Sequence, residues 1–191
     1  MKKILIISLC VLFALSALLA GCGGNADDNG SADASDAVSD TESKEVEMGD
    51  TYEYHGTSVL LPKGFSVSET TAHSLATPED YPVHPDNVVI TFEKRSKVAD
   101  IEESSMLSLY KETDKDVFAT LEKFDEFTKA EKDGHDTLLL RYTITYSDIE
   151  MTVTQYAVDV ADGIVSYTFT SVTGEYADAF RASLSSIKVT E

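Results

Sequence analysis

The pattern of hydrophobic and polar positions divides the chain into three parts. Residues 4–20 are almost entirely apolar, residues 23–50 hold almost no large apolar side chain, and residues 51–191 mix apolar and polar positions in short periods. A stretch rich in small and acidic residues cannot bury enough apolar surface to offset its ordering entropy. We therefore predict an apolar leader over residues 1–21, a disordered acidic tether over residues 22–50 and one globular domain over residues 51–191.

The domain shows the period of two that is typical of half-buried strands. Apolar side chains occupy every second position over residues 88–92, 138–146, 156–160 and 165–169. Shorter apolar runs flank the turn Pro62-Lys63-Gly64, and these runs predict two further strands.

One hairpin can be assigned from its turn. The dipeptide Asp162-Gly163 predicts a two-residue turn with a positive φ at the glycine. We therefore predict that Gly163→Val destabilises the domain by about 1 kcal/mol or more, through strain at positive φ. The cross-strand pairs that this turn would create are Val160 with Val165, Val158 with Tyr167, and Tyr156 with Phe169.

Apolar residues also recur at helical spacing in three segments. The first segment is residues 101–110, and the second begins at Asp116 as the expected N-cap. The apolar side of this second helix would consist of Val117, Phe118, Leu121 and Phe124. The third segment closes the chain with the stripe Tyr176, Phe180, Leu184 and Ile187. Strands followed by a closing helix predict an α+β domain, in which helices pack on the faces of a central antiparallel sheet.

The apolar leader ends in a recognisable processing motif. Two lysines, Lys2 and Lys3, precede the apolar run, as in a secretory signal peptide. The run ends in Leu19-Ala20-Gly21-Cys22, which resembles the lipobox of bacterial lipoproteins. The resemblance implies cleavage before Cys22 and lipidation of its thiol. Two acyl chains suffice for stable membrane anchoring, so we expect a lipid-anchored protein on the extracytoplasmic side of the cell membrane.

Charge and cysteine content narrow the chemistry further. The chain carries a net charge of −19, and residues 51–191 hold 25 acidic and 12 basic residues. Such a surface excludes partners that are recognised by phosphate neutralisation, so we expect no nucleic acid binding. The other cysteine, Cys10, lies in the leader. The mature domain is therefore expected to lack a disulfide, a cysteine metal site and a cysteine nucleophile.

No catalytic motif emerges from the spacing of the polar residues. The four histidines, His55, His73, His84 and His135, do not follow a metal-binding pattern. We expect no metal, no cofactor and no enzymatic activity. His84 lies in a proline-stiffened loop with Tyr81 and Asp86, and stiff loops present side chains at low entropic cost. These three residues are the candidate binding residues.

A row of hydroxyl side chains offers a second candidate surface. Period two places the row on the sheet face opposite the apolar set, where it forms either a polar docking surface or a face that a helix covers. The residues of this row are Thr143, Thr145, Ser166, Thr168 and Thr170.

Several stretches resemble the PsbP-like family of small α/β/α domains. These stretches are "LLPKGF", "NVVITFEKR", "YAVDVADGIVSYTFTS" and "YADAFRASLSSIKV". The family includes a photosystem II extrinsic protein, a nuclear-import Ran-binding factor and many bacterial lipoproteins. The resemblance covers nearly all of residues 51–191. It implies a central antiparallel sheet with helices on both faces, and a non-enzymatic role as an interaction or accessory domain.

The expected function is a monomeric, lipid-anchored accessory module of the cell envelope that binds an unknown envelope protein. Two alternatives stay open at this point. The first is a ligand- or metal-binding accessory subunit. The second is a small envelope hydrolase, which would need a pocket that joins His84 or His135 to a serine or a carboxylate.

Overall fold

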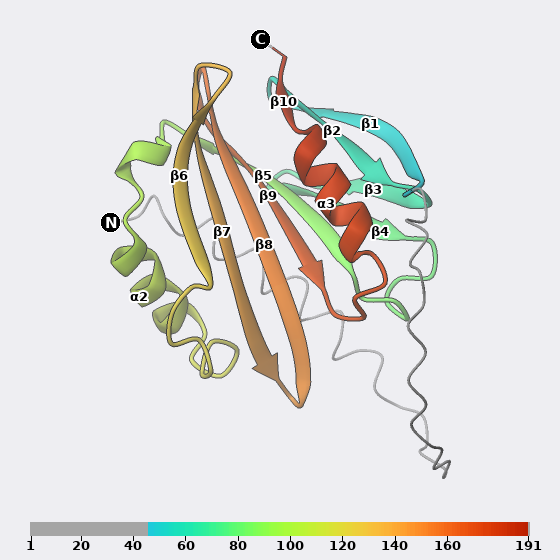
Figure 1. Ribbon diagram of the computed structural model, residues 1–191, viewed down its shortest axis with the longest axis vertical. Helices are drawn as coiled ribbons and strands as arrows, with labels where there is room; N and C mark the ends of the chain where they lie inside the picture. Colours follow the sequence, from blue (N-terminus) through green and yellow to red (C-terminus); the bar gives the residue numbers. More distant parts are fainter. Residues whose placement is uncertain (1–45, 191) are drawn as a thin grey trace, which may run out of the picture.

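The computed structural model describes residues 46–190 (Figure 1). The predicted leader, Cys22 and most of the predicted tether lie outside these residues. The strands are β1 (Met48–Tyr54), β2 (Thr57–Pro62), β3 (Phe65–Glu69), β4 (His73–Pro78), β5 (Asn87–Lys94), β6 (Glu126–Lys132), β7 (His135–Tyr146), β8 (Ile149–Val160), β9 (Gly163–Ser171) and β10 (Lys188–Val189). The helical elements are the 3₁₀ turn η1 (Val98–Asp100) and the helices α2 (Glu103–Thr113) and α3 (Ala177–Ser186).

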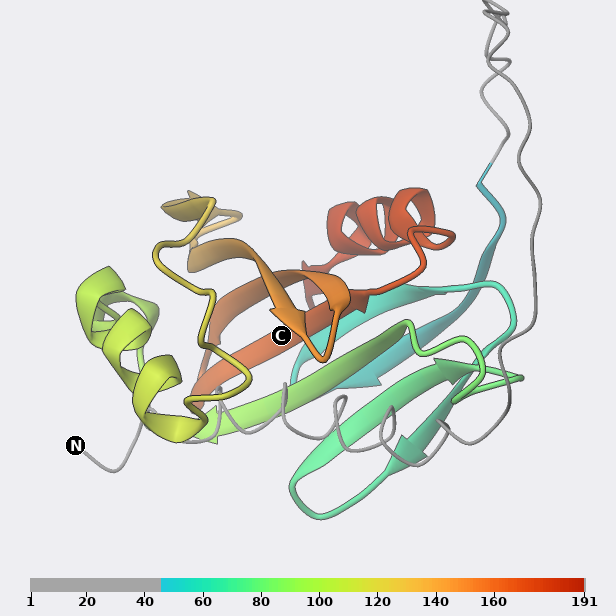
Figure 2. The ribbon, with the colours of Figure 1, turned by 90° about the horizontal axis from the view of Figure 1, so that it is seen from below.

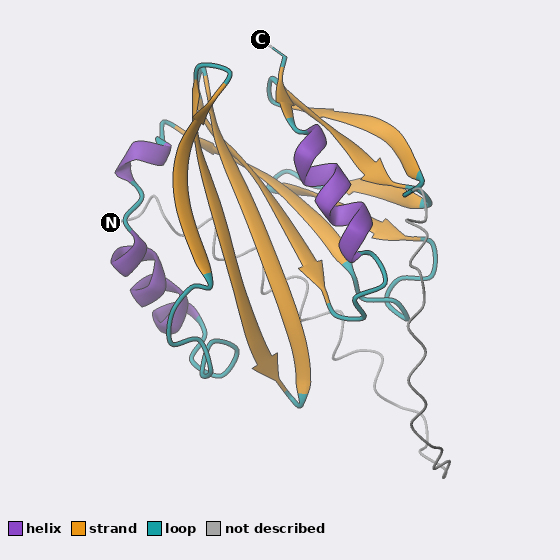
Figure 3. Ribbon diagram, viewed as in Figure 1, coloured by secondary structure: helices purple, strands orange, loops and turns teal. Residues whose placement is uncertain are grey.

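The strands form two antiparallel sheets. A seven-stranded sheet has the order β3-β4-β5-β9-β8-β7-β6, and a three-stranded sheet has the order β1-β2-β10. Figure 1 shows α3 beside the small sheet, and Figure 2 shows strands of the large sheet between α2 and α3. The helices and strands are distinguished by colour in Figure 3. The predicted α+β class is therefore confirmed, and the small sheet is an addition to it.

The large sheet is buried on both faces. On one face, α2 and the following loop pack over β7 and β8, with Tyr110 and Tyr142 at the centre. On the other face, α3 and β2 pack over β5, β8 and β9, with Tyr167 and Phe180 among the buried rings. Leu139, and not Leu140, pairs with Tyr156. The alternating apolar residues of β7, which include Leu140, therefore lie on the opposite face of the sheet from those of β8, which include Tyr156.

The hydroxyl row does not form one surface. Ser166, Thr168 and Thr170 are each only 2% exposed and lie on the face that α2 covers. There, Gln155 Nε2 donates to Thr168 Oγ1 at 3.2 Å and Tyr110 Oη donates to Gln155 Oε1 at 3.0 Å. Thr143 and Thr145 are exposed, and they lie on the opposite face. The hypothesis that these five residues form one docking surface is therefore wrong.

The β8–β9 hairpin differs in register from the prediction. Val160 pairs with Gly163, so the turn residues are Ala161 and Asp162, and Val158 pairs with Val165. Gly163 lies in β9 and its φ is not positive. The predicted pairs are therefore displaced by two residues, and the strain argument for Gly163 is wrong.

Two other features differ from what the sequence pattern predicts. The segment after Asp116 does not form a regular helix; it is a series of turns. Asp114 Oδ1 accepts hydrogen bonds from the amides of Asp116 and Val117 at 3.0 and 3.1 Å, and this local bonding turns the chain. The apolar residues that suggested a helix are nevertheless buried against α2. At the other end, β1 begins at Met48, inside the segment predicted as tether.

Two properties of the described part of the chain bear on function. No helix within residues 46–190 is long and apolar enough to cross a membrane. In the same residues, the His, Cys, Asp and Glu side chains form no group of three or more that could hold a metal ion.

Candidate functional site

The proline loop before β5 packs against the loop that leads into α3. Asp86, at the end of the proline loop, is fully buried. Its carboxylate accepts hydrogen bonds from Val172 N at 3.1 Å, from Thr173 N at 3.4 Å and from Thr173 Oγ1 at 2.7 Å. Asp86 therefore joins two loops of the chain. Tyr81 is half-buried, and burial raises the pKa of its hydroxyl above 10.0.

His84 lies between carboxylates from both loops. Its Nδ1 contacts Asp80, and its Nε2 lies 3.6 Å from Glu175 Oε2. The hydrogen bond that His84 Nδ1 donates to the Asp80 carboxylate, and the charge of that carboxylate, raise the pKa of His84 above 6.5, and Glu175 and Asp86 add to the effect. When it is protonated, His84 would link the proline loop to the loop before α3, and Asp86 joins the same two loops.

This arrangement predicts a pH-dependent contribution of His84 to stability. Because the pKa of His84 is raised in the folded state, its contribution is complete below a pH of about 6.5 and is lost as the pH rises through the folded-state pKa. We expect the melting temperature of the wild-type protein to exceed that of His84→Gln only at a pH below the folded-state pKa of His84. An NMR titration of His84 should show a pKa above 6.5 that falls in Asp80→Asn. Equal midpoints in the two proteins would contradict the Asp80 contact.

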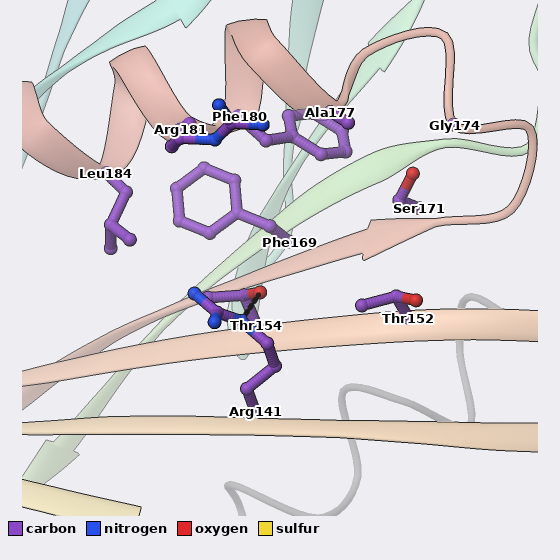
Figure 4. Close-up of a pocket in the computed structure, with 10 residues that line it drawn as sticks. All are labelled: Arg141, Thr152, Thr154, Phe169, Ser171, Gly174, Ala177, Phe180, Arg181 and Leu184. Atoms are coloured by element: carbon purple, nitrogen blue, oxygen red, sulfur yellow. Dashed lines mark hydrogen bonds between the residues drawn. The ribbon is translucent and has the colours of Figure 1, made fainter. Parts of the chain in front are cut away.

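A groove that sequence reasoning missed lies between α3 and the large sheet. Its volume is about 360 Å³. The side chains that line it come from three adjacent strands and from α3 and the loop before it (Figure 4). The lining residues are Arg141, Thr152, Thr154, Phe169, Ser171, Gly174, Ala177, Phe180, Arg181 and Leu184.

The register of β7, β8 and β9 forms the sheet side of the groove. Arg141 pairs with Thr154, and Thr154 pairs with Phe169, so these three side chains form one row across the sheet. Thr152 pairs with Ser171 in the next row on the same face. Paired residues point to the same side of a sheet, so a guanidinium group, three hydroxyl groups and a phenyl ring all face α3.

The helix side of the groove follows from the spacing along α3. Ala177, Phe180, Arg181 and Leu184 recur at intervals of three and four residues, which places them on one face of a helix. Phe180 is buried against Phe169, with ring centroids 5.5 Å apart. Figure 4 shows Phe169 between the side chains of α3 and those of Arg141 and Thr154. The groove therefore has an apolar floor and a polar wall along the strands.

Both charged residues of the lining are arginines. Arg141 Nη1 lies 3.2 Å from Glu126 Oε2, and Arg141 Nε donates to Thr154 Oγ1 at 3.4 Å. Arg181 Nη2 lies 2.9 Å from Asp178 Oδ1, one turn earlier on α3. A guanidinium group has five N–H donors, so these contacts leave donors on each arginine for a ligand. The groove therefore presents two guanidinium groups, each beside one carboxylate, on a domain with a net negative charge.

One signal in the sequence could have indicated this site. The whole chain has three arginines, Arg95, Arg141 and Arg181, and two of them line the groove. Arg141 also interrupts a run of hydroxyl and apolar side chains over residues 137–146. Sequence position alone could not place Arg141 and Arg181 on opposite walls, because this placement depends on how α3 packs on the sheet.

Comparison with known proteins agrees on the fold. The chain matches no family model and no curated protein. The solution structure of cyanobacterial PsbP from Synechocystis sp. PCC 6803 matches with a TM-score of 0.57 at 12% identity, over 79% of this chain and 97% of that chain. LpqN, involved in cell envelope biogenesis of Mycobacterium tuberculosis, matches with a TM-score of 0.46 at 14% identity, over 78% of this chain and 88% of that chain. The match to cyanobacterial PsbP shows that the chain has the PsbP-like fold.

Proposed function

We propose that this chain is a lipoprotein that is anchored at Cys22 on the extracytoplasmic side of the cell membrane, and that its domain is a non-enzymatic accessory module of the cell envelope. The observation that carries the proposal is the motif Leu19-Ala20-Gly21-Cys22 at the end of an apolar leader. The cysteine of such a motif receives lipid, and two acyl chains hold a protein stably on a membrane.

The acidic segment fits this placement. The segment ahead of β1, residues 23–47, contains eight acidic residues and one lysine. We infer that this segment is a tether, because a random coil of this length would span roughly 30 Å and repulsion between its charges would extend it. It would hold the domain clear of the membrane, while the negative charge of the domain disfavours contact with anionic head groups.

The chemistry of the groove supports a binding role. Its two charged groups are guanidinium groups, which stay protonated in proteins and cannot serve as general bases. His135 lies elsewhere, and its Nδ1 is 3.0 Å from the backbone oxygen of Asp159. His84 contacts two carboxylates at the start of α3. These side chains support a domain that binds a partner or a ligand, without a reaction of its own.

Lipidation can be tested with the two cysteines of the chain. In bacteria that are fed an alkyne-labelled fatty acid, we expect the wild-type chain to carry the label and to fractionate with membranes. Cys22→Ala should abolish the label, because no other thiol is left in the chain after the leader. Cys10→Ala, which changes the leader alone, is the matched control and should keep the label. A label that survives Cys22→Ala would overturn the proposal.

The accessory role calls for a separate measurement. Crosslinking in intact cells should capture a specific envelope protein, and this capture should weaken in Cys22→Ala because the unanchored chain is no longer held near the membrane. Capture that is the same with and without the anchor would contradict a function at the membrane.

The groove favours a second candidate function, a ligand-binding accessory subunit. A volume of about 360 Å³ lies in the range of small-molecule sites. This function keeps the anchor and the fold, and adds a small ligand as the recognised group.

A further inference from the structure

We propose that the groove between α3 and strands β7–β9 binds a small organic acid that carries one carboxylate on an apolar body. This inference deepens the ligand-binding form of the proposed function, and it rests on the side chains of the groove.

The apolar lining determines one half of the ligand. Phe169, Phe180 and Leu184 line the groove from the sheet and from α3. Burial of apolar ligand surface against such side chains contributes roughly 25 cal/mol per Å². The volume of about 360 Å³ is near the lower limit for ligand pockets, so the apolar part must be short, of the size of one ring or a brief alkyl chain.

The arginines determine the other half of the ligand. Arg141 reaches the groove from the strand wall and Arg181 reaches it from α3. An arginine binds a carboxylate through two parallel N–H donors, and the hydroxyl groups of Thr152, Thr154 and Ser171 add further donors on the strand wall. An apolar body and a carboxylate therefore each find a matching part of the groove.

The surrounding charge favours a single negative charge on the ligand. Glu126 and Asp178 lie next to the two arginines, and residues 51–191 as a whole hold 25 acidic and 12 basic residues. A doubly charged phosphate would meet more repulsion from these carboxylates than a monocarboxylate would. Glu126 also forms an ion pair with Arg141 Nη1, so the carboxylate of a ligand must compete with Glu126 for this guanidinium group.

The test compares an acid with its neutral analogue on the purified full-length chain. The probes are 4-phenylbutyrate and 4-phenylbutyramide, titrated by calorimetry in a neutral detergent with a detergent-only blank. We expect the acid to bind about tenfold more tightly than the amide, since charge-assisted hydrogen bonds are the stronger ones. This preference should decline as the salt concentration rises.

Matched variants assign the preference to the groove. Arg141→Gln and Arg181→Gln should each reduce the affinity for the acid toward that for the amide. Arg95→Gln is the control, because Arg95 is exposed and lies outside the groove lining. Glu126→Gln should strengthen acid binding several-fold, since it removes the competing carboxylate. Arg141 and Arg181 have side chains that are 43% and 74% exposed, so both variants are expected to fold, and melting curves would verify this.

The outcomes are distinct. Equal affinity for acid and amide, no binding of either probe, or equal losses in Arg95→Gln and the two groove variants would overturn the inference. The titration does not depend on lipidation. If the wild-type chain carries no lipid label in cells but prefers the acid in the titration, the proposed location alone is contradicted. If the chain carries the label but shows no preference for the acid, the groove inference alone is contradicted.

Discussion

Gly163→Val should lower the free energy of unfolding by about 3 kcal/mol, the largest loss expected from one added side chain in this domain. A Cβ atom at Gly163 would lie 2.1 Å from the backbone oxygen of Glu93, 2.9 Å from its carbonyl carbon and 3.0 Å from the Cα of Lys94. These are backbone atoms of the neighbouring strand β5, and they cannot move unless β5 and β9 separate. The two strands are paired along the whole of β5, and Gly163 faces Lys94 at the turn end of this pair, so the added atom would push the two strands apart there.

Gly134→Ala provides the control that separates the two possible roles of a glycine. Gly134 has a φ of +80°, and a Cβ there would have no atom within 4 Å. Its alanine variant therefore reports backbone strain alone, about 1 kcal/mol. Gly163→Ala should cost clearly more, because it adds the clashing atom at a negative φ. Denaturant titration of the three variants measures this difference. A loss in Gly163→Ala no larger than that in Gly134→Ala would contradict the close contact with β5.

The glycine also shows how far the hairpin could be derived from the sequence. Alternation correctly assigned β8 and β9 as strands, and it placed Val158, Val165 and Tyr167 on one face. The predicted register was wrong by two residues. A shift of two residues leaves every side chain on its original face of the sheet. The pattern therefore contains no information that separates the two registers. The hydrogen bond from Arg95 N to Asp162 O, at 2.7 Å, belongs to the observed turn, and it joins residues distant in the sequence.

Two of the strands that the sequence pattern missed, β1 and β6, have a related explanation. β6 lies at the edge of the large sheet, and most of its residues are exposed and polar, so it has no apolar alternation to recognise. β1 lies at the edge of the small sheet and begins in a segment whose composition suggested a tether. Charged and polar side chains are typical of edge strands, where they discourage pairing with other chains. Composition alone does not distinguish such strands from linkers.

The candidate site was only partly accessible from the sequence. The proline loop contains the three predicted residues, and two of them, His84 and Asp86, contact the loop that leads into α3. Their role as ligand-binding residues stays a prediction. The groove itself needs Arg141 and Arg181 on opposite walls, and this depends on the packing of α3 against β9. Local patterns predicted each element, but the site is formed by contacts between elements.

Asp86→Ala should lower the free energy of unfolding by about 2–4 kcal/mol, because it removes a buried carboxylate that accepts hydrogen bonds from three donors. These donors are the amides of Val172 and Thr173 and the hydroxyl group of Thr173. The loop that contains them leads directly into α3, whose side chains form one wall of the groove. The variant should therefore also increase hydrogen exchange in the first turn of α3 and weaken binding of 4-phenylbutyrate.

Two variants of neighbouring design isolate the role of the buried carboxylate. Asp86→Asn keeps one acceptor oxygen but turns an NH₂ group toward the donors, so its loss of stability should be intermediate. Asp80→Ala removes a carboxylate from the same loop whose side chain is 51% exposed, and it should have a much smaller effect on both stability and exchange. If Asp86→Ala and Asp80→Ala behaved alike, the bonds to Val172 and Thr173 could not be what holds α3 over the groove. Full stability with faster exchange in α3 would instead mean that Asp86 positions the helix without stabilising the domain, because local opening and global unfolding are separate equilibria.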